Sequence, residues 1–522
     1  MRRIFNVAGP CNPQKHYMID AVRRLGAEVL SLISDGQYFV IHAARQTGKT
    51  TLLRELTRRI NGEGKYYALY CSLEKADGIA DPEKGISAII NAIREKLDSY
   101  DFPHASAFGA DNAGYDYASI LQRSLRIYCA KLDKPLVVFF DEADALCDQT
   151  LISFLRQLRD GYVDRPDAPF VHSLGLIGMR NIRDYRDQYR SQGKTLGSSS
   201  PFNIVTSTMT LRNFTQGEIA ELYAQHTADT GQIFEEAAVE LVWRQTQGQP
   251  WLVNAIAREA VQNITRDDPR QSVTADMAET AIQTLILQRG THFDSLMARL
   301  REERIKRVVE PIIIGESGKL DPIGDDYLYA KDLGLIRDDR GKVEPANPIY
   351  GEIIIRALNW RTQQAIEEHG YPYQMPRYMK EDGTLDMEYL LRDFQVFWRE
   401  NAAIWQERYD YKEAAPHLVM QAFLQRVVNG GGQITREMAT GTRRVDLCIV
   451  FRNHKYPIEL KIRYGEDTRD EGLKQITAYM DTLGADAGWL VLFDRRETLG
   501  WTEKLTFEKA IVDGKTVNII GC

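Results

Sequence analysis

Residues 38–52 read YFVIHAARQTGKTTL, and this stretch decides the fold of the first part of the chain. A short apolar run of strand type is followed by a polar turn and then by residues that favour a helix. Gly48, Lys49 and Thr50 match the end of the P-loop pattern. In that pattern backbone N–H groups surround phosphates, the lysine reaches the β- and γ-phosphates, and the hydroxyl binds Mg²⁺. The spacing therefore predicts a strand–loop–helix unit that binds ATP and Mg²⁺.

The loop departs from the pattern at its first position, where Ala43 replaces glycine. Alanine does not adopt positive φ cheaply, so we expect the entry of the loop to differ slightly. The amides nearest the phosphates come later, and the expected nucleotide-binding residues are Arg45, Gln46, Thr47, Gly48, Lys49, Thr50 and Thr51. The alternative is a Gly-Lys turn before a surface helix, but the strand and the helix stand where the motif requires them.

A second apolar run, PLVVFF at residues 135–140, ends in Asp141 and Glu142. Such a continuous run is typical of a central strand of a parallel sheet, buried on both faces. Together with the P-loop it predicts a Walker B arrangement, in which Asp141 holds Mg²⁺ and Glu142 orients and deprotonates the attacking water. The two acids could instead cap the next helix, but the P-loop upstream disfavours this interpretation.

Two further apolar runs complete the expected sheet. YYALYCS at 66–72 is a plausible strand, and HSLGLIGMRN at 172–181 ends in Arg180 and Asn181, which we expect to face the γ-phosphate. Strands that alternate with helical stretches predict a doubly wound α/β domain with its ligand at the carboxyl ends of the strands.

At this point the chain resembles the archaeal-type and STAND-like branch of the AAA-related P-loop ATPases. AARQTGKTT and VVFFDEAD carry the resemblance, together with the opening GPCNPQKHYM and the lid-like stretches SPFNIVTSTMTLRNFTQGEI and TQGQPWLVN. The resemblance covers roughly residues 1–360. It implies an ATPase core at 1–210, a helical lid at 211–290 and a winged helix at 291–360.

The resemblance also implies contacts with the nucleotide base. Gly248-Gln249-Pro250 matches a GxP element that contacts the base in such proteins, so Pro250 and either Tyr17 or His16 are candidate base contacts. The alternative is a C-cap glycine followed by the start of a new helix.

A basic segment, RLREERIKRVVEPII at 299–313, opens the expected winged helix. Winged helices can read DNA, and five side chains could contact phosphates: Arg299, Arg301, Arg304, Lys306 and Arg307. Three glutamates interleave with these residues, which favours a solvated or interdomain helix face over a nucleic-acid surface.

The polar, proline-punctuated stretch 361–400 is predicted to be a linker, and residues 401–522 a separate domain. Residues 411–428 predict a helix that Pro416 either interrupts or starts, and NGGG ends it. QITREM, VDLCIVFR and YPIELKIR then alternate apolar and polar residues between turn formers. We therefore expect a helix followed by a meander of three strands.

In the last of these strands Glu459 and Lys461 share one face, opposite the apolar residues between and beside them. If Asn453-His454 is a two-residue hairpin turn, the numbers of opposed residues sum to 907, and Asp446 lies directly across from Lys461. A slip of one residue would reverse the faces. On this register two acids and a lysine converge.

Asp446, Glu459 and Lys461, followed by a helix with Gln475 and Tyr479, resemble the PD-(D/E)XK nuclease superfamily. The resemblance implies a restriction-endonuclease-like α/β domain in which Asp446, Glu459 and a helix acid bind Mg²⁺ and Lys461 orients the attacking water. Glu413 is the candidate helix acid, with Glu407 as its rival. The alternative is a charge-paired strand face without catalysis.

Composition limits the remaining possibilities. The 522 residues predict several domains, the net charge of −7 excludes a whole-surface attraction to nucleic acid or anionic membrane, and six scattered cysteines suit reduced thiols. We expect a cytoplasmic homo-oligomer that does not associate with membranes.

We interpret the chain as an ATP-dependent switch controlling a Mg²⁺-dependent nuclease that acts on nucleic acid, DNA in the first place, and the domain combination suggests defence against foreign DNA. The alternative is a STAND-like regulatory ATPase whose C-terminal nuclease fold is inactive and serves binding.

Overall fold

The computed structural model describes most of the chain. The described residues are 3–26, 28–110, 112, 114–178, 204–288, 291–313, 320–339, 341–354, 378–408, 415–428, 432–440, 443–452, 454–463, 467–494, 496 and 499–522. They divide into two compact units. The first comprises Met1–His292, Pro322–Arg337 and Pro345–Tyr350, and the second comprises Phe293–Asp321, Asp338–Glu344 and Gly351–Cys522.

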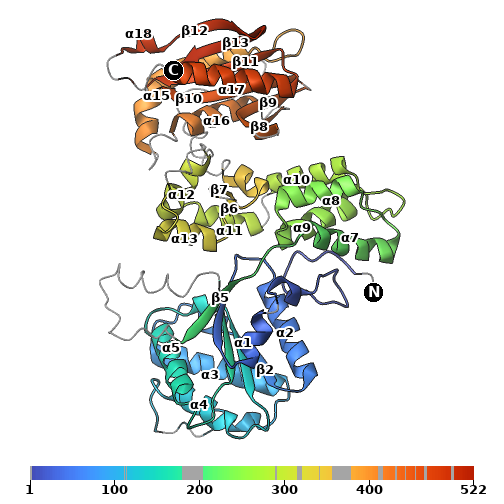
Figure 1. The fold of residues 1–522 in the computed structure, drawn as a ribbon, viewed down its shortest axis with the longest axis vertical. Coiled ribbons are helices and arrows are strands. Elements are labelled where there is room, and N and C mark those ends of the chain that lie inside the picture. The colour runs from blue at the N-terminus through green and yellow to red at the C-terminus, as the bar shows by residue number, and fades with distance from the viewer. Residues whose placement is uncertain are drawn as a thin grey trace. The chain divides into compact units, whose positions relative to one another are not determined.

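A parallel sheet of five strands forms the centre of the first unit (Figure 1). Its order is β2-β3-β4-β1-β5. The strands are β1 (Tyr38–His42), β2 (Tyr67–Ser72), β3 (Leu136–Asp141), β4 (Ser173–Gly178) and β5 (Val205–Thr210). The predicted parallel sheet is therefore confirmed. β4 separates the P-loop strand β1 from the Walker B strand β3, so their carboxyl ends lie at one edge of the sheet.

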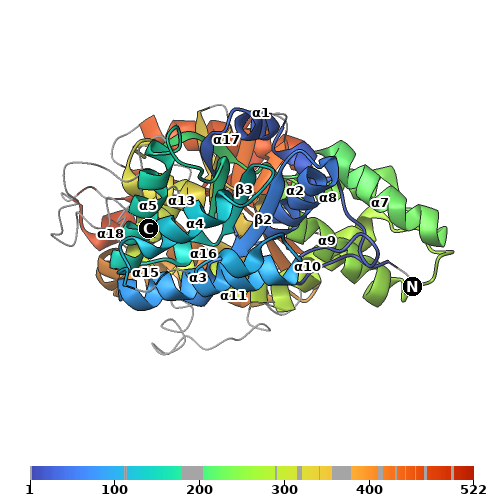
Figure 2. The same ribbon diagram turned by 90° about the horizontal axis from the view of Figure 1, so that it is seen from below.

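Helices cover both faces of this sheet, as Figure 2 shows from below. The helices are α1 (Glu28–Ser34) and α2 (Lys49–Glu63) on one face and α3 (Pro82–Ser99), α4 (Ile120–Cys129) and α5 (Asp148–Val163) on the other. Each face has its own apolar core: Leu52, Leu53 and Leu56 of α2 belong to one, and Ile86, Ile89 and Phe154 to the other. Short 3-10 helices connect these elements: η1 (Ala21–Arg24), η2 (Glu74–Ala76), η3 (Ala105–Ala107) and η4 (Ala143–Ala145).

The stretch 211–290, for which the resemblance implies a lid, is helical in the described residues, and we refer to it as the lid. It consists of α7 (Gln216–Thr230), α8 (Glu236–Thr246), α9 (Pro250–Arg258), the π-helical turn η5 (Glu259–Ile264) and α10 (Ala275–Gln288). Thr215 and Glu218 form a capping box at the start of α7. The lid-like stretch at 200–219 needs a correction, because residues 205–210 form the edge strand β5 of the core sheet.

The stretch expected to form a winged helix contains α11 (Thr291–Arg299), α12 (Glu303–Ile313), α13 (Asp325–Asp332), β6 (Ile336–Asp339) and β7 (Lys342–Pro345). The predicted order of helix, strand, turn and strand is present, since β6 and β7 form a two-stranded sheet. Two of the basic side chains pair with glutamates close in sequence. Arg299 lies 2.9 Å from Glu302, and Lys306 pairs with Glu303.

A mixed sheet of six strands organises the second unit, in the order β12-β13-β11-β10-β9-β8. The strands are β8 (Gly432–Thr440), β9 (Arg443–Phe451), β10 (His454–Arg463), β11 (Ala487–Asp494), β12 (Phe507–Val512) and β13 (Lys515–Gly521). The helices are α15 (Met387–Arg408), α16 (Ala415–Val428), α17 (Asp467–Leu483) and α18 (Trp501–Lys504). The predicted helix and three-stranded meander are present as α16 and β8–β10, and α16 starts at Ala415, next to Pro416.

The predicted linker at 361–400 is wrong in its second half. α15 begins at Met387, and its residue Phe394 is fully buried against Phe423 of α16 and Phe493 of β11. The polar and proline-rich stretch misled the interpretation because the apolar residues of α15 recur at helical spacing only after Met387. The C-terminal domain therefore includes this helix.

The predicted hairpin register is also wrong. His454 pairs with Phe451 and Ile458 pairs with Leu447, so opposed residues sum to 905 instead of 907 and His454 belongs to β10. Extended by one residue, this register sets Asp446 opposite Glu459 and not opposite Lys461. The error came from placing the turn one residue too late, and such a shift of the turn moves the sum of opposed residue numbers by two.

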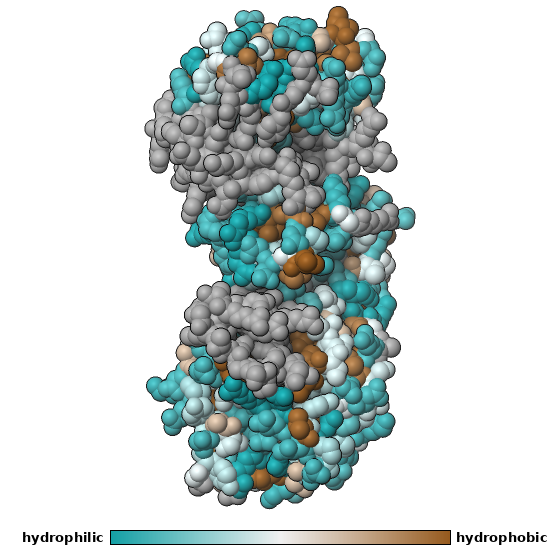
Figure 3. All heavy atoms as spheres, turned by 60° about the vertical axis from the view of Figure 1, so that its left-hand side comes forward, coloured by the Kyte–Doolittle hydropathy of each residue, from teal (hydrophilic) through white to brown (hydrophobic). Residues whose placement is uncertain are grey.

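Hydrophilic residues dominate the face shown in Figure 3, where hydrophobic residues form small separate groups. Among the helices that the structure describes, none is both long and apolar enough to cross a membrane.

Candidate functional site

The P-loop runs from the end of β1 to the start of α2, and its backbone has the positive φ angles that such a turn requires. Gln46 has φ 58° and Gly48 has φ 89°. The Nζ atom of Lys49 donates hydrogen bonds to the carbonyl oxygens of Ala43 (2.6 Å) and Ala44 (2.9 Å), so the ammonium group lies inside the loop. The loop thus places a cation and backbone amides where phosphates bind in P-loop proteins.

Thr50 and Asp141 meet across the sheet edge. The Oγ1 atom of Thr50 donates to Oδ2 of Asp141 at 2.8 Å, and the hydroxyl of Tyr70 donates to the same oxygen at 3.1 Å. Asp141 is 1% exposed. A hydroxyl and a carboxylate at this distance are hard oxygen ligands, which suit Mg²⁺, so the two residues fit the predicted metal site.

Glu142 follows in a strained backbone conformation, with φ 57° and ψ 40°. Its Oε2 atom accepts a hydrogen bond from Ser72 at 3.2 Å. Ser72 ends β2 and pairs with Asp141 in the sheet register, which explains why it reaches the acid that follows Asp141. Burial, reinforced by the negative charge of Asp141, raises the pKa of Glu142. A raised pKa moves a carboxylate toward the range of an effective general base.

Burial lowers the pKa of Lys49, and the carboxylates of Asp144 and Asp141 oppose that shift. Asp141 at the end of β3, with Glu142 and Asp144 after it, thus maintains a negative field around the lysine. A negative field of this kind favours a cation at this edge of the sheet.

Two of the predicted nucleotide-binding side chains have other partners in the structure. The Oγ1 atom of Thr51 accepts a hydrogen bond from the backbone N–H of Cys11 (2.9 Å), so this side chain anchors the N-terminal segment. Tyr17 is 1% exposed and packs among Phe5 and His226, so it is not available for stacking on a base. Arg180 lies outside the described residues.

The GxP element reaches the P-loop through Gln249. Its Nε2 atom lies 3.5 Å from the carbonyl oxygen of Gln46, while its Oε1 atom caps α9 by accepting from Leu252. Pro250 is buried at the first position of α9. Gly248 has φ 72°, and a Cβ there would come within 1.9 Å of the carbonyl oxygen of Phe214. The glycine is therefore required by a close backbone approach.

Sequence reasoning assigned no role to several residues that shape this site: Ser72, Tyr70, Gln249 and Arg24. Ser72 could have been found, because it ends a predicted strand beside the predicted Walker B strand. Arg24 gave no signal in the sequence. It lies 23 residues before Thr47, and only the fold brings its guanidinium to the carbonyl oxygen of that residue (2.7 Å).

A second polar cluster lies in the C-terminal sheet. Glu459 on β10 is 2% exposed, and its Oε1 atom lies 2.9 Å from Nζ of Lys461. The pair points to one side of the strand as predicted, but Glu459 is buried and does not face solvent. His417 on α16 is also buried, and burial, followed by the charge of Lys461, lowers its pKa to about 4.

The predicted metal ligands of this cluster are only partly described. Glu413 lies outside the described residues, and the backbone of Asp446 is described while its side chain is not. Glu407 lies on α15, again without a described side chain. Within the described part of the chain, no group of three His, Cys, Asp or Glu side chains could hold a metal ion.

The parallel sheet, the loop with Lys49 and the Thr50–Asp141 contact define a P-loop ATPase-type nucleotide site. The sequence matches the AAA-like domain family over residues 23–354, which is more than half of its 522 residues. The chain therefore belongs to the AAA-like domain family. The sequences of curated proteins gave no match.

Three solved structures are similar to part of this chain. The Walker-type ATPase PABY2304 of Pyrococcus abyssi is 13% identical, with 67% of this chain and 99% of that chain covered and a TM-score of 0.45. The RuvB Holliday junction branch migration motor of Thermotoga maritima is 13% identical, with coverage of 68% and 95% and a TM-score of 0.34. Cdc6p of Pyrobaculum aerophilum is 15% identical, with coverage of 64% and 92% and a TM-score of 0.35.

Proposed function

We propose that the chain is an ATP-binding and ATP-hydrolysing switch that controls Mg²⁺-dependent cleavage of nucleic acid by its C-terminal domain. The observation that carries the first half of this proposal is the 2.8 Å contact between Thr50 of the P-loop helix and Asp141 at the end of β3. Lys49 lies at the same edge of the sheet, and Glu142 follows directly. The chain thus brings the groups of an ATP-hydrolysing site together.

Each of these residues has a separable task. Mg²⁺, when bound, neutralises phosphate charge. Thr50 and Asp141 would hold it, and Lys49 would exchange its bonds to Ala43 and Ala44 for bonds to the β- and γ-phosphates. Glu142, with its raised pKa and its hydrogen bond from Ser72, would take the proton of the attacking water.

The second half of the proposal rests on Glu459 and Lys461. A carboxylate and a lysine at i and i+2 of one strand lie on the same face. If the register continues one residue past the last pair, Leu447 with Ile458, the backbone of Asp446 lies opposite Glu459. Two carboxylates in that arrangement would bind Mg²⁺, and Lys461 would orient the attacking water or stabilise the developing negative charge. His417 adds a buried polar group from α16.

The substrate and the biological setting are proposed by analogy. Cleavage of nucleic acid, DNA in the first place, fits the nuclease-like strand pattern, and a cytoplasmic homo-oligomer would allow nucleotide binding to govern its assembly. An ATPase joined to a nuclease fits defence against foreign DNA, and this suggestion rests on the combination of domains alone.

A second candidate function is favoured by one observation. Glu459 is 2% exposed and already pairs with Lys461 at 2.9 Å, which is also what a purely structural buried ion pair would look like. In this alternative the C-terminal fold is inactive and binds a partner, while the ATPase unit regulates that binding.

Cleavage assays distinguish the two. Purified protein is incubated with single- and double-stranded DNA and RNA, with Mg²⁺ or EDTA, and with ATP, ADP or no nucleotide. The proposal expects Mg²⁺-dependent cleavage of at least one substrate by the wild type and none by Glu459→Gln. Binding without cleavage of any substrate would favour the regulatory alternative, and ATP hydrolysis measured in the same samples tests the first half separately.

A further inference from the structure

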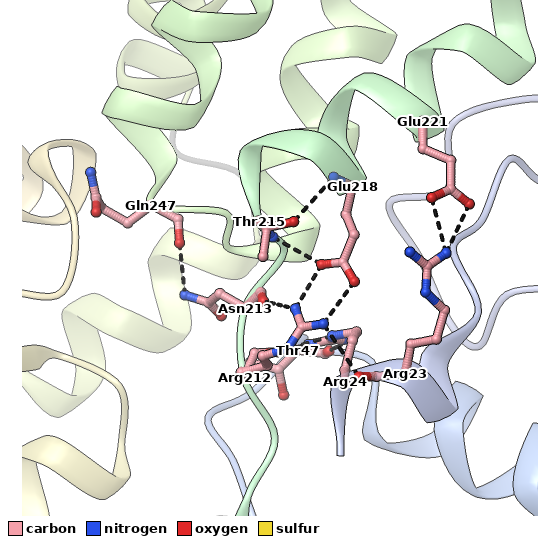
Figure 4. Close-up of polar contacts among 9 residues, drawn as sticks. All are labelled: Arg23, Arg24, Thr47, Arg212, Asn213, Thr215, Glu218, Glu221 and Gln247. Atoms are coloured by element: carbon pink, nitrogen blue, oxygen red, sulfur yellow. Dashed lines mark hydrogen bonds and ion pairs between the residues drawn. The ribbon is translucent and has the colours of Figure 1, made fainter. Parts of the chain in front are cut away.

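Arg24, the last residue of η1, joins the P-loop to the entry of the lid. Its side chain is buried, with the residue 4% exposed. The Nη1 atom donates to the carbonyl oxygen of Thr47 in the P-loop at 2.7 Å. On the other side Nε and Nη2 donate to the carbonyl oxygen of Arg212, at 2.9 and 2.6 Å (Figure 4). One guanidinium therefore bridges two peptide segments that lie far apart in sequence.

All three hydrogen bonds of the buried Arg24 guanidinium go to backbone carbonyl oxygens, and none of them goes to a carboxylate. Burial lowers the pKa of Arg24 to about 10, so the group remains a cation at neutral pH. A buried cation is costly unless it is well hydrogen-bonded, and here two carbonyl oxygens and the ring of Phe214, 5.0 Å away, stabilise it. The planar fork of arginine can serve both carbonyls at once, whereas a lysine ammonium cannot match that geometry.

The lid side of the bridge is firmly attached to the lid helices. The guanidinium of Arg212 makes two hydrogen bonds to Glu218, at 2.7 and 2.8 Å, and Glu218 closes the capping box of α7. Asn213 donates to the carbonyl oxygen of Gln247 at 3.1 Å, as Figure 4 shows. A shift of the Arg212 carbonyl would therefore move the start of α7 and the turn before α9 together.

We propose that Arg24 is a positioning residue that couples the conformation of the P-loop to the position of the lid. This inference rests on nucleotide binding at the P-loop, as proposed above. Thr47 precedes Gly48 in the turn that would wrap the phosphates, so a ligand that reorients this turn also moves the carbonyl that Arg24 holds. Arg24 then transmits the displacement to Arg212 and α7.

The neighbouring Arg23 provides a matched control. It lies on the same turn, and its guanidinium makes hydrogen bonds of 3.0 and 3.1 Å to both carboxylate oxygens of Glu221 on α7. Both side chains are about half exposed, at 50% and 47%, and the hydrogen bonds between them join η1 to the lid helix α7. Loss of Arg23 therefore removes a charge and a lid contact but leaves the bridge intact.

Hydrogen exchange of the full-length protein tests the coupling. Amide exchange is measured by mass spectrometry for peptides that cover residues 43–56 and 213–230, without nucleotide, with Mg-ADP and with a Mg-bound non-hydrolysable ATP analogue. The variants are Arg24→Lys, Arg24→Gln and Arg23→Gln, and the binding of a fluorescent ADP is titrated in parallel.

In the wild type we expect nucleotide to slow exchange in both peptides. In Arg24→Lys and Arg24→Gln, nucleotide should still slow amide exchange in the 43–56 peptide. In the 213–230 peptide, the slowing caused by nucleotide should be smaller than in the wild type by about fivefold or more. Arg23→Gln should behave like the wild type in both peptides. The inference is overturned if both Arg24 variants keep the wild-type slowing in α7, or if nucleotide slows only the P-loop in the wild type. Unfolding of both Arg24 variants would also overturn it, since Arg24 would then be a core residue. Failure of the wild type to bind either nucleotide would instead refute the proposed function.

Discussion

At the scale of single residues, the structure gives different partners to side chains that the sequence analysis grouped together as nucleotide-binding residues of the P-loop. Thr50 and Thr51 are adjacent, yet Thr50 bonds to Asp141 while Thr51 accepts from the backbone of Cys11. On a helix successive side chains point about 100° apart, so only one of the two can face the site. The sequence pattern identified the loop, and the geometry of the helix determines that the hydroxyl of Thr50, and not that of Thr51, faces Asp141.

Replacement of Lys49 by alanine should abolish tight nucleotide binding or hydrolysis. The change removes the cation that complements the β- and γ-phosphates, and we expect ATP turnover to fall roughly 10²-fold or more. The measurement is steady-state ATP hydrolysis together with titration of a fluorescent nucleotide. Wild-type affinity and turnover in this variant would contradict the P-loop assignment.

Glu142→Gln should bind ATP and fail to hydrolyse it. The amide retains the shape of the side chain and its hydrogen bond from Ser72 but loses the ability to accept a proton from water. Single-turnover hydrolysis and nucleotide binding are compared with the wild type. If the variant hydrolyses ATP at the wild-type rate, Glu142 is not the general base.

In the second unit, Asp446→Ala, Glu459→Gln and Lys461→Ala should each reduce nucleic-acid cleavage by roughly 10²-fold or more while ATP hydrolysis persists. The amide at position 459 is preferred over alanine because Glu459 is buried, and a truncated side chain would leave a cavity. Asp446→Ala and Glu459→Gln should also weaken Mn²⁺ binding, measured by calorimetry. Lys461→Ala should not, because it removes a nearby positive charge. If all three variants cleave nucleic acid as fast as the wild type, these residues have no catalytic role and their charges are structural.

At the scale of elements, the sequence patterns predicted those helices, strands and turns that depend mainly on residues close together in the chain. The strand–loop–helix at 38–52, the Walker B strand and the helix with its meander in the C-terminal domain all follow from periodicity and turn residues. The errors lie where a choice between neighbours depends on tertiary packing. The hairpin turn before His454 was placed one residue late, and α15 was not predicted because it follows a polar stretch that contains Pro372 and Pro376.

The first turn of α7 offers a test of pH dependence. The hydrogen bonds from Arg212 lower the pKa of Glu218 to about 2, from an ordinary value of 4.5. Because the folded-state pKa is depressed, the stabilisation is fully present above pH 4.5 and is lost as the pH falls toward 2. Glu218→Gln should lower the Tm at pH 7 by about 2 °C, and the difference from the wild type should vanish near pH 2.

The control for this measurement is Glu221→Gln, which removes the exposed partner of Arg23. Exposed ion pairs contribute little, so its Tm should match the wild type across the same pH range. A Tm difference for Glu218→Gln that stays constant from pH 7 to pH 2 would contradict a role for the carboxylate charge.

At the scale of the whole molecule, the sequence predicted five segments and the structure groups the described residues into two compact units. The stretch expected to form a winged helix is divided between them, which no composition shift in the sequence marks. Fold class was predictable because buried strands and motif spacing repeat across many proteins. The link between the P-loop and the first lid helix was not predictable, because Arg24 makes contacts that exist only in the folded chain.

We propose that the nucleotide at the P-loop controls cleavage of nucleic acid by the C-terminal domain. The most direct test is the rate of Mg²⁺-dependent cleavage of one nucleic-acid substrate by the full-length protein in saturating ATP, in ADP and without nucleotide, with Glu142→Gln as the variant held in the ATP-bound state. We predict that the wild type cleaves at different rates in ATP and in ADP. As the wild type hydrolyses its ATP, its cleavage rate should move toward the rate in ADP, whereas the rate of Glu142→Gln in ATP should stay constant. Identical rates in all three conditions for the wild type, with nucleotide binding verified, would contradict it.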